Sequence, residues 1–372
     1  MTPDPMVLEM GRKFSAERLA PGAAAREKAA AIEPEIIAEL GELGILGATT
    51  PAEWDGSELD PVTYALLLEE IAAGDGSVST LVSVHNSPTC AVLAMYGTDA
   101  QKDRWLRPLA TGRHVGSFGL TEPQAGSDAS NLRSRAVRTG DRYVINGAKQ
   151  FISNAALPGS IVLFAVTDPA AGKRGLSCFV VDKSAPGFKV LRKEQKLGQK
   201  ASDTCALAFE DMEVAADQRV GAEGDGYRIA LSTLESGRIG IAAQSVGMAR
   251  AALEAATAYA RDRSAFGAPI IEHQAVAFRL VDAKTRLEAA RQLTLHAARQ
   301  RAAGENALEA ACMAKLFASE TAEAICTAAI QTLGGYGYLA DFPVERIYRD
   351  VRVCQIYEGT SDVQKIILQR ML

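Results

Sequence analysis

The sequence contains few metal-ligating residues, and none of them stands in a ligand pattern. Only four histidines and six cysteines occur among the 372 residues, with no H-E-x-x-H or C-x-x-C spacing, so no structural metal is expected. Blocks of Lys or Arg are also absent and the net charge is −5, which argues against nucleic acid as a partner because phosphate binding requires clustered positive charge. Scattered cysteines indicate a reduced, cytoplasmic protein in which they serve as small core residues.

Long apolar segments and nucleotide-binding motifs are missing as well. The run IVLFAV, residues 161–166, is far shorter than the about 20 residues that a membrane-spanning helix needs. The first ten residues, MTPDPMVLEM, carry two acids and two prolines, which is typical of neither a signal peptide nor a transit peptide. No P-loop motif, no G-x-G-x-x-G after a strand and no G-x-S-x-G occurs, so P-loop, Rossmann and α/β-hydrolase sites are excluded. We expect no membrane contact.

Length and local composition predict an α+β protein of three domains, because 372 residues are too many for one simple core. Residues 1–112 are rich in Ala, Glu and Leu and predict an N-terminal α-helical domain, in which Asp60 caps a helix that begins at Pro61. Residues 113–217 are rich in turn formers and β-branched residues and predict a small middle β-barrel or sandwich domain. Residues 218–372 predict a C-terminal four-helix bundle.

The middle domain contains recognisable strands and turns. The stretch TGDRYVINGAKQFIS has two turn signals, Gly140-Asp141 and Asn146-Gly147, around a short apolar strand. Further apolar, β-branched strands are predicted at 160–168, 176–184 and 205–214.

Two apolar stripes with helical spacing support the bundle. Many Ala and Gly residues along them would let the helices approach closely. One stripe repeats every seven residues and the other alternates spacings of four and three: Ile239, Val246, Leu253 and Ala260, then Val276, Leu280, Ala283, Leu287 and Ala290.

Three stretches have compositions that suggest ligand contacts. Residues 118–132 form a loop rich in Gly, Ser and Pro, residues 261–274 place two arginines and an aromatic residue inside a helical run, and residues 331–364 contain a Gly-Gly pair and Glu358. From composition alone, a plain surface loop, a solvated basic turn and an ordinary loop glutamate remain open alternatives.

Taken together and in order along the chain, these stretches resemble the acyl-CoA dehydrogenase family, and most of all its short-chain (butyryl-type) members. The resemblance covers essentially the whole chain. It is densest at LTEPQAGSDA, INGAKQFISNA, LESGRIGIAAQSVGMA, RSAFGAPIIEHQ, QTLGGYGY and YRDVRVCQIYEGTSDVQ.

The resemblance implies a flavoenzyme with non-covalent FAD that oxidises an acyl-CoA to the trans-2-enoyl-CoA in fatty-acid β-oxidation. The residues implied at the flavin are Phe118, Leu120, Thr121, Gly126, Ser127, Phe151, Ile152, Ser153, Thr360 and Asp362. Those implied at the pyrophosphate and adenosine of a neighbouring subunit's FAD are Arg263, Phe266, Gln274, Gln331, Leu333, Gly334 and Gly335. Those implied at the substrate are Ser127, Glu235, Arg238, Tyr357 and Gly359.

The resemblance also makes Glu358 the catalytic base, which removes the α-proton while a hydride passes from the β-carbon to flavin N5. From the residues, Ser361 and Gln364 have capping-box spacing and would pin a turn that leaves Glu358 just outside the last helix. Burial would raise the pKa of Glu358 toward working pH. Relatives that carry the base on a helix place it where this chain has Gly237, which has no side chain to act.

Three positions depart from the family pattern: Phe151 stands where Trp is common, Gln124 where Gly is usual, and Glu235 where Asp is usual. The resemblance further implies a homotetramer and electron-transfer flavoprotein as electron acceptor. Alternatives that stay open are a branched short-chain acyl-CoA dehydrogenase, an oxygen-using acyl-CoA oxidase and a catalytically idle flavin or acyl-CoA binding protein. Nitroalkane oxidation and glutaryl-CoA as substrate are less favoured.

Overall fold

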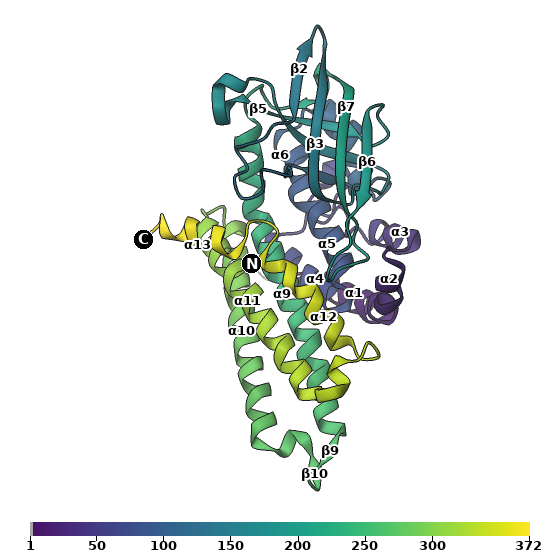
Figure 1. Ribbon diagram of the computed structural model, residues 1–372, viewed down its shortest axis with the longest axis vertical. Coiled ribbons are helices and arrows are strands. Elements are labelled where there is room, and N and C mark those ends of the chain that lie inside the picture. Colours follow the sequence, from purple (N-terminus) through teal and green to yellow (C-terminus); the bar gives the residue numbers. More distant parts are fainter. Residues whose placement is uncertain (1–2) are drawn as a thin grey trace.

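Helices occupy both ends of the chain and a mixed sheet forms its middle, as Figure 1 shows. The structure is a computed structural model that describes residues 3–372. The sheet lies at one end of the long axis, the longest helices at the other, and the N-terminal helices beside the junction of the two. The predicted α, β, α arrangement is confirmed.

The N-terminal part is helical, as predicted. Asp60 caps α4 by accepting hydrogen bonds from the backbone N–H groups of Val62 and Thr63, and Pro61 is the first helical residue. Most of α4 and α5 is buried, and α4 packs against the long helix α9 (Gly226–Asp262). The helices are α1 (Pro5–Phe14), α2 (Ala23–Ala29), α3 (Pro34–Glu42), α4 (Pro61–Gly74), α5 (Gly76–Val84), α6 (Ala91–Tyr96), α7 (Asp99–Gln101) and α8 (Arg107–Ala110).

The middle part is an eight-stranded sheet with the strand order β6-β7-β3-β2-β4-β5-β8, in which β1 pairs with β4. The predicted strands near 160, 176 and 205 are confirmed as β4, β5 and β7. Ile145, Leu163, Phe179 and Phe209 belong to the apolar core inside the sheet. The strands are β1 (Ser117–Gly119), β2 (Arg135–Thr139), β3 (Arg142–Ser153), β4 (Ser160–Val166), β5 (Leu176–Asp182), β6 (Phe188–Lys193), β7 (Thr204–Ala215) and β8 (Arg219–Val220).

One of the two predicted turns is wrong. Gly140, with φ +64°, does join β2 to β3, but β3 continues through Asn146 and Gly147 with an irregularity in its pairing to β7. The Asn146 side chain donates to Asp211 Oδ1 at 3.0 Å and accepts from the Asp211 N–H at 2.8 Å, so pairing with the neighbouring strand replaces the turn. The pairing of β3 with β7 shifts register between Ile145 and Gly147, which marks a bulge, and a side chain on Gly147 would collide with Ser134.

The C-terminal part contains three long helices that lie side by side, with shorter helices against them (Figure 1). Ile239, Val246, Leu253 and Ala260 are all buried on α9, which confirms the first predicted stripe. On α10, Leu280, Ala283 and Ala290 are buried, whereas Val276 and Leu287 of the second stripe are partly buried against the same core. The fourth member of the bundle, α12, is short. The elements are α9 (Gly226–Asp262), β9 (Ser264–Ala265), β10 (Ala268–Pro269), α10 (Gln274–Ala302), α11 (Leu308–Leu333), α12 (Pro343–Val351) and α13 (Ser361–Gln369).

All six cysteines are free and buried, as expected of core residues. Across residues 3–372, no three His, Cys, Asp or Glu side chains gather as metal ligands would. None of the helices in this part of the chain combines the length and the apolarity needed to cross a membrane.

Candidate active site

Glu358 lies in a left-handed turn just before α13. Its φ is +55° and that of Gly359 is +87°, a conformation that costs a residue with a side chain about 1–2 kcal/mol. The helix cap differs from the prediction: the Thr360 hydroxyl accepts from the Val363 N–H at 3.2 Å, and Ser361 is already the first helical residue. The predicted capping box on Ser361 is therefore wrong by one position, although Glu358 does stand just outside the helix.

Two buried side chains hold this turn by its carbonyl groups. Lys315 Nζ on α11 donates to the Gly359 carbonyl at 2.6 Å. Gln364 Nε2 donates to the same carbonyl at 2.9 Å and to the Glu358 carbonyl at 3.2 Å. Both side chains are fully buried. Left-handed conformations of this kind persist where the surroundings fix them, and these donors do so.

The Glu358 carboxyl group is half-buried and lacks a direct partner at one oxygen. Its Oε2 atom is buried and makes no hydrogen bond in the structure. Burial raises the pKa of Glu358 to about 7, and the positive charges of Arg238 and Lys315 hold it below the value that burial alone would give. A carboxylate with a pKa near neutrality and an unoccupied oxygen is suited to accept a proton from a ligand.

Gly237 on α9 faces this same carboxyl group. A Cβ atom placed on Gly237 would lie 2.8 Å from Glu358 Oε2 and 3.0 Å from its Cδ. The neighbouring Arg238 is buried, and its Nε has no hydrogen-bond partner. Glu235 instead forms an ion pair at 2.8 Å with Arg301 of α10. The structure thus brings Glu358, Gly237 and Arg238 together. The Glu235 carboxylate is paired with Arg301 instead.

Tyr357 anchors the base segment to other parts of the molecule. Its hydroxyl donates to Gln244 Oε1 at 3.1 Å and lies 3.5 Å from Gln199 Nε2, in the loop between β6 and β7. Gln199 also bonds to Asp350 of α12 through its backbone N–H. Burial raises the pKa of Asp350 to about 7. The segment that carries Glu358 is therefore tied to the middle sheet and to α9.

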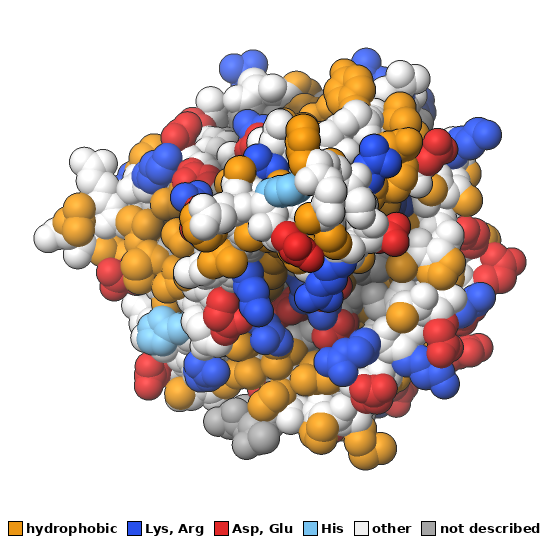
Figure 2. Space-filling model, turned by 90° about the horizontal axis from the view of Figure 1, so that it is seen from below, with side chains coloured by type: hydrophobic (Ala, Val, Ile, Leu, Met, Phe, Trp, Pro, Cys, Tyr) orange, Lys and Arg blue, Asp and Glu red, His pale blue; other side chains and the backbone are white. Residues whose placement is uncertain are grey.

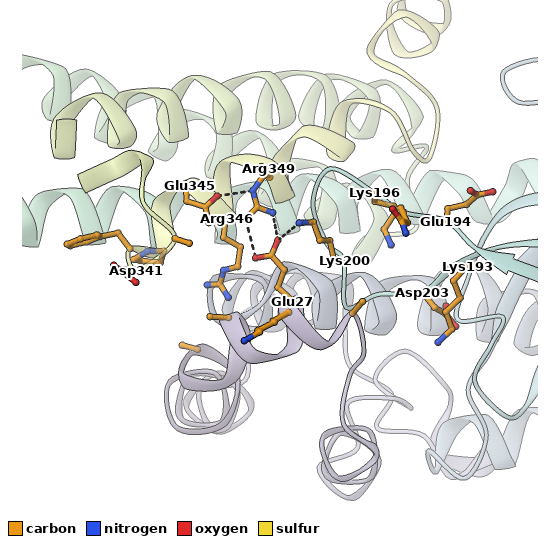
Figure 3. Close-up of a pocket in the computed structure, with 18 residues that line it drawn as sticks. Glu27, Lys193, Glu194, Lys196, Lys200, Asp203, Asp341, Glu345, Arg346 and Arg349 are labelled. Carbon is orange, nitrogen blue, oxygen red and sulfur yellow. Dashed lines mark hydrogen bonds and ion pairs between the residues drawn. The ribbon is translucent and has the colours of Figure 1, made fainter. Parts of the chain in front are cut away.

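A cavity of about 1000 Å³ lies between α2, the β6–β7 loop and α12, but it is lined by other residues than Glu358. Figure 3 shows Glu27 at its centre, paired with Arg349 and Lys200, while Arg349 also pairs with Glu345. This charged cluster ties α2 to α12 and to the β6–β7 loop.

The loop 118–127 is fixed by a buried ion pair. Lys149 Nζ on β3 lies 2.8 Å from Glu122 Oε1, with both side chains almost wholly buried, and it also donates to the Leu120 carbonyl at 3.1 Å. The Gln150 N–H donates to the Thr121 carbonyl at 2.9 Å. Sequence reasoning missed Lys149 and Glu122, although a lysine in a buried strand is a signal that a partner must exist.

The Gln124 departure from the family pattern fits this loop. Gln124 Nε2 donates to Glu122 Oε2 at 2.7 Å and to the Asn131 carbonyl at 3.2 Å, so the side chain closes the loop on itself. Gly126 and Ser127 beyond it are exposed, and a Cβ on Gly126 would meet no atom within 4 Å. The loop thus presents an open, small-residue surface.

The end of β3 presents an aromatic ring next to this loop. Phe151 has φ +61° and is 63% exposed, which leaves its ring uncovered. Ser153 is half-buried. The Ile152 side chain packs in the sheet core and is closed to a ligand. The ring of Phe118 packs inward on Phe164, with centroids 5.1 Å apart.

The predicted pyrophosphate and adenosine residues gather at the opposite end of the molecule, around the β9–β10 hairpin and the end of α11 (Figure 1), whereas Thr360 and the exposed Asp362 lie at the start of α13. The Arg263 guanidinium lies 5.9 Å from the centroid of the Tyr336 ring, which joins the hairpin to the end of α11. Leu333 is buried in the bundle, so its side chain is closed to a ligand. Exposed there are Arg263, Phe266, Gln274, Gln331, Gly334 and Gly335.

The end of the molecule at the β9–β10 hairpin therefore exposes apolar and cationic side chains. Phe266 at the hairpin is 99% exposed. Figure 2, which views the molecule from below, shows hydrophobic side chains reaching the surface among charged ones. One chain thus separates the predicted FAD contacts into a flavin group near Phe151 and a second group at the hairpin.

Models of three domains match almost the whole chain. They are "Acyl-CoA dehydrogenase, N-terminal domain" at residues 4–113, "Acyl-CoA dehydrogenase, middle domain" at 117–212 and "Acyl-CoA dehydrogenase, C-terminal domain" at 224–372. The chain belongs to the acyl-CoA dehydrogenase family. This acyl-CoA dehydrogenase is accordingly an oxidoreductase that uses FAD. Three features fit that cofactor and an acyl-CoA beside it: the exposed ring of Phe151, the open space around Gly126 and the unpartnered Oε2 of Glu358.

Individual relatives resemble this acyl-CoA dehydrogenase over nearly their full length. The chain is 42% identical to "Acyl-CoA dehydrogenase" of Bacillus subtilis, over 99% of this chain and 97% of that protein. The structure of butyryl-CoA dehydrogenase from Megasphaera elsdenii is similar with a TM-score of 0.97 and 38% identity, covering 100% of this chain and 99% of that one.

A chain in the structure described as "Electron transferring flavoprotein of Acidaminococcus fermentans: Towards a mechanism of flavin-based electron bifurcation" is also similar. Its TM-score is 0.96 at 42% identity, covering 98% of this chain and 96% of that one.

Proposed function

We propose that this acyl-CoA dehydrogenase acts on short-chain acyl-CoA thioesters and that Glu358 is its general base. The observation that carries the proposal is the unpartnered Oε2 of a half-buried carboxyl group whose pKa burial raises to about 7. The likeness to butyryl-CoA dehydrogenase supports a short acyl chain. A branched short-chain substrate would use the same base.

The chain's own residues would position the substrate and accept its proton. The α-proton of a thioester is weakly acidic, so a base must take it while developing negative charge on the thioester oxygen is stabilised. Glu358 Oε2 would receive the proton, and the Glu358 backbone N–H would donate to the thioester oxygen. Arg238, whose Nε is buried without a partner, would contact the CoA portion, with Ser127, Tyr357 and Gly359 around it. FAD, when bound, accepts the hydrogen and the electron pair that leave the β-carbon.

Two separated groups of residues would hold the FAD. The loop 118–127, residues 151–153, Thr360 and Asp362 would contact the flavin part. Arg263 and the other hairpin residues would contact the pyrophosphate and adenosine of a neighbouring subunit's FAD, because they lie at the opposite end of the same chain (Figure 1). We therefore propose that FAD binding requires an oligomer.

Exposed apolar side chains on the long helices support this assembly. Phe278 and Val281 on α10 are 61% and 59% exposed, and Phe317 on α11 is 39% exposed. Phe278 and Val281 are three residues apart and so share one face of α10, and exposed apolar side chains gathered on one face are typical of a subunit interface. We propose a homotetramer. Within each chain, we propose that the domain boundaries lie at 112/113 and 217/218.

Electron-transfer flavoprotein is the proposed electron acceptor. Its support is the similarity to a chain from an electron-transferring flavoprotein structure. The six free, buried cysteines support the proposed cytoplasmic location, because they are typical of a reducing compartment.

The experiment that tests the base is Glu358→Gln, assayed with butyryl-CoA and a dye as electron acceptor. The variant should retain FAD and bind butyryl-CoA, yet lose turnover by at least about 100-fold, the scale of general-base catalysis. Glu320→Gln, at an exposed carboxylate paired with Lys365 at 3.6 Å, is the matched control and should keep wild-type turnover. Near-normal activity of the Glu358 variant would overturn the proposal.

A further inference from the structure

Lys315 is a charged residue in an otherwise apolar stretch of α11. The sequence around it reads ACMAKLFAS, and its side chain is 0% exposed. Burying an ammonium group is costly unless it is hydrogen-bonded or near negative charge. A lysine at this position therefore requires a local reason, and the reason is found at the base segment.

The ammonium group of Lys315 reaches the turn that carries Glu358. It donates to the Gly359 carbonyl at 2.6 Å, and Gln364 donates to the same oxygen from the other side at 2.9 Å. Glu358 and Gly359 both have positive φ, so the direction of the Glu358 side chain depends on this turn being held. Lys315 fixes it from α11 and Gln364 fixes it from α13.

The positive charge of the same ammonium group opposes the rise in the pKa of Glu358, but no hydrogen bond joins the two side chains. Its hydrogen bond goes to a carbonyl, and Glu358 Oε2 keeps no partner. The ionisable groups around the pair come from α9, α11 and the segment before the turn: Arg238, Cys312 and Cys354. Lys315 and Arg238 supply the positive charge in this group. Burial lowers the pKa of Lys315 to about 8, so its charge is present near pH 7 and is lost as the pH rises through 8.

We propose that Lys315 is a positioning residue for the catalytic base: it holds the Glu358–Gly359 turn through the Gly359 carbonyl and keeps the carboxylate ionised through its charge. This inference rests on the proposed role of Glu358. The role of Lys315 explains why a charged residue is buried here. A neutral donor such as Gln364 also holds the backbone, but it supplies no charge.

The charge of Lys315 should set the acid limb of the pH profile. Burial raises the pKa of Glu358 to about 7, while Arg238 and Lys315 oppose that rise. Removing the Lys315 charge leaves only Arg238 in opposition, so the pKa of Glu358 should rise further. The base acts in its ionised form, so turnover should then require higher pH, and an acid limb displaced upward by one pH unit lowers turnover about tenfold below it.

The test compares Lys315→Met, Lys315→Gln, Lys315→Arg and Gln364→Met in the FAD-loaded protein. Two readouts are measured from pH 5 to 9: turnover of butyryl-CoA with a dye, and exchange of the α-protons of acetyl-CoA in D₂O followed by NMR. Acetyl-CoA has α-protons but no β-carbon, so its exchange reports proton removal without oxidation. Bound FAD, read from its absorbance, shows whether each variant is folded and loaded.

The expected result is an acid limb displaced upward in both readouts for Lys315→Met and Lys315→Gln. Lys315→Arg should restore the limb because the charge returns. Gln364→Met should lower the rates without moving the limb, because it removes a carbonyl contact but no charge. If Lys315→Met does not fold, Lys315→Gln carries the test.

An unmoved limb in a loaded, charge-free Lys315 variant would overturn the inference. Glu358→Gln separates that outcome from failure of the proposed function. If Glu358→Gln is inactive while the Lys315 variants keep the wild-type limb, only the inference about Lys315 is wrong. If Glu358→Gln keeps turnover, the assignment of the base is wrong, and the role of Lys315 is wrong with it.

Discussion

A methyl group on Gly237 should displace the carboxylate of Glu358, the proposed base. The added Cβ in Gly237→Ala would lie 2.8 Å from Glu358 Oε2, so the carboxylate must retreat by about 0.6 Å to reach an ordinary contact of 3.4 Å. Misplacing a reacting group by about 1 Å can cost about 100-fold in rate. We therefore expect turnover to fall roughly 10- to 100-fold, which corresponds to about 1.4–2.7 kcal/mol in the activation barrier.

The assay is turnover of butyryl-CoA with a dye acceptor, beside FAD content and thermal unfolding. FAD content should be unchanged because the three atoms nearest to the added Cβ all belong to the Glu358 side chain. Gly240→Ala on the same helix is the control: its Cβ would lie 3.1 Å from Ser83 Oγ, a milder crowding against a hydroxyl group. Turnover of Gly237→Ala within twofold of that control would refute the reasoning.

Three further predictions concern stability and cofactor binding. Burial raises the pKa of Glu358 from 4.5 to about 7, so its ionised form destabilises the fold above pH 7, and this cost disappears below pH 4.5. Glu358→Gln should therefore raise the free energy of unfolding by roughly 1–3 kcal/mol at pH 8 and leave it unchanged at pH 4. Denaturant titration at the two pH values measures the difference. Lys149→Met leaves Glu122 buried without its cation, so it should lower the free energy of unfolding by about 3–5 kcal/mol and weaken FAD retention. Lys189→Met, at an exposed ion pair, is the control and should change neither quantity. Equal effects of the two substitutions would contradict the role of the buried pair. Arg263→Ala should weaken FAD retention and make it depend more steeply on protein concentration in a dilution series; FAD held as tightly by a dilute monomer would contradict the cross-subunit site.

The helices and the strands could be predicted from the sequence because their signals are local. The stripe from Ile239 to Ala260 has the helical period that its burial requires, and Asp60 with Pro61 carries a complete helix start in adjacent residues. The apolar runs of β4 and β5 are buried along almost their whole length, so composition alone indicated them.

The errors arose where distant contacts override a local pattern. Asn146-Gly147 is a strong turn signal, but Asn146 bonds to Asp211 on β7, and pairing across the sheet keeps the strand extended. Thr360 replaces Ser361 as the helix cap, a difference of one residue that spacing does not resolve because both carry hydroxyl groups.

In the candidate site, too, the residues with local sequence signals could be predicted and those fixed by distant contacts could not. Motif resemblance pointed to Glu358, whereas Lys315 acts on a carbonyl group 44 residues away in the sequence. Lys149 likewise reaches back 27 residues to Glu122. A buried lysine is visible in the sequence only as a charge inside an apolar run, and its partner is set by how the elements pack.

The most direct test of the central claim is α-proton exchange in the Glu358→Gln variant. Wild-type protein loaded with FAD should exchange the α-protons of acetyl-CoA with D₂O, with a rate that rises through pH 7 as Glu358 ionises. The variant should bind FAD and acetyl-CoA but exchange no faster than buffer. Exchange at the wild-type rate in the variant would contradict the account, because another group would then be removing the proton.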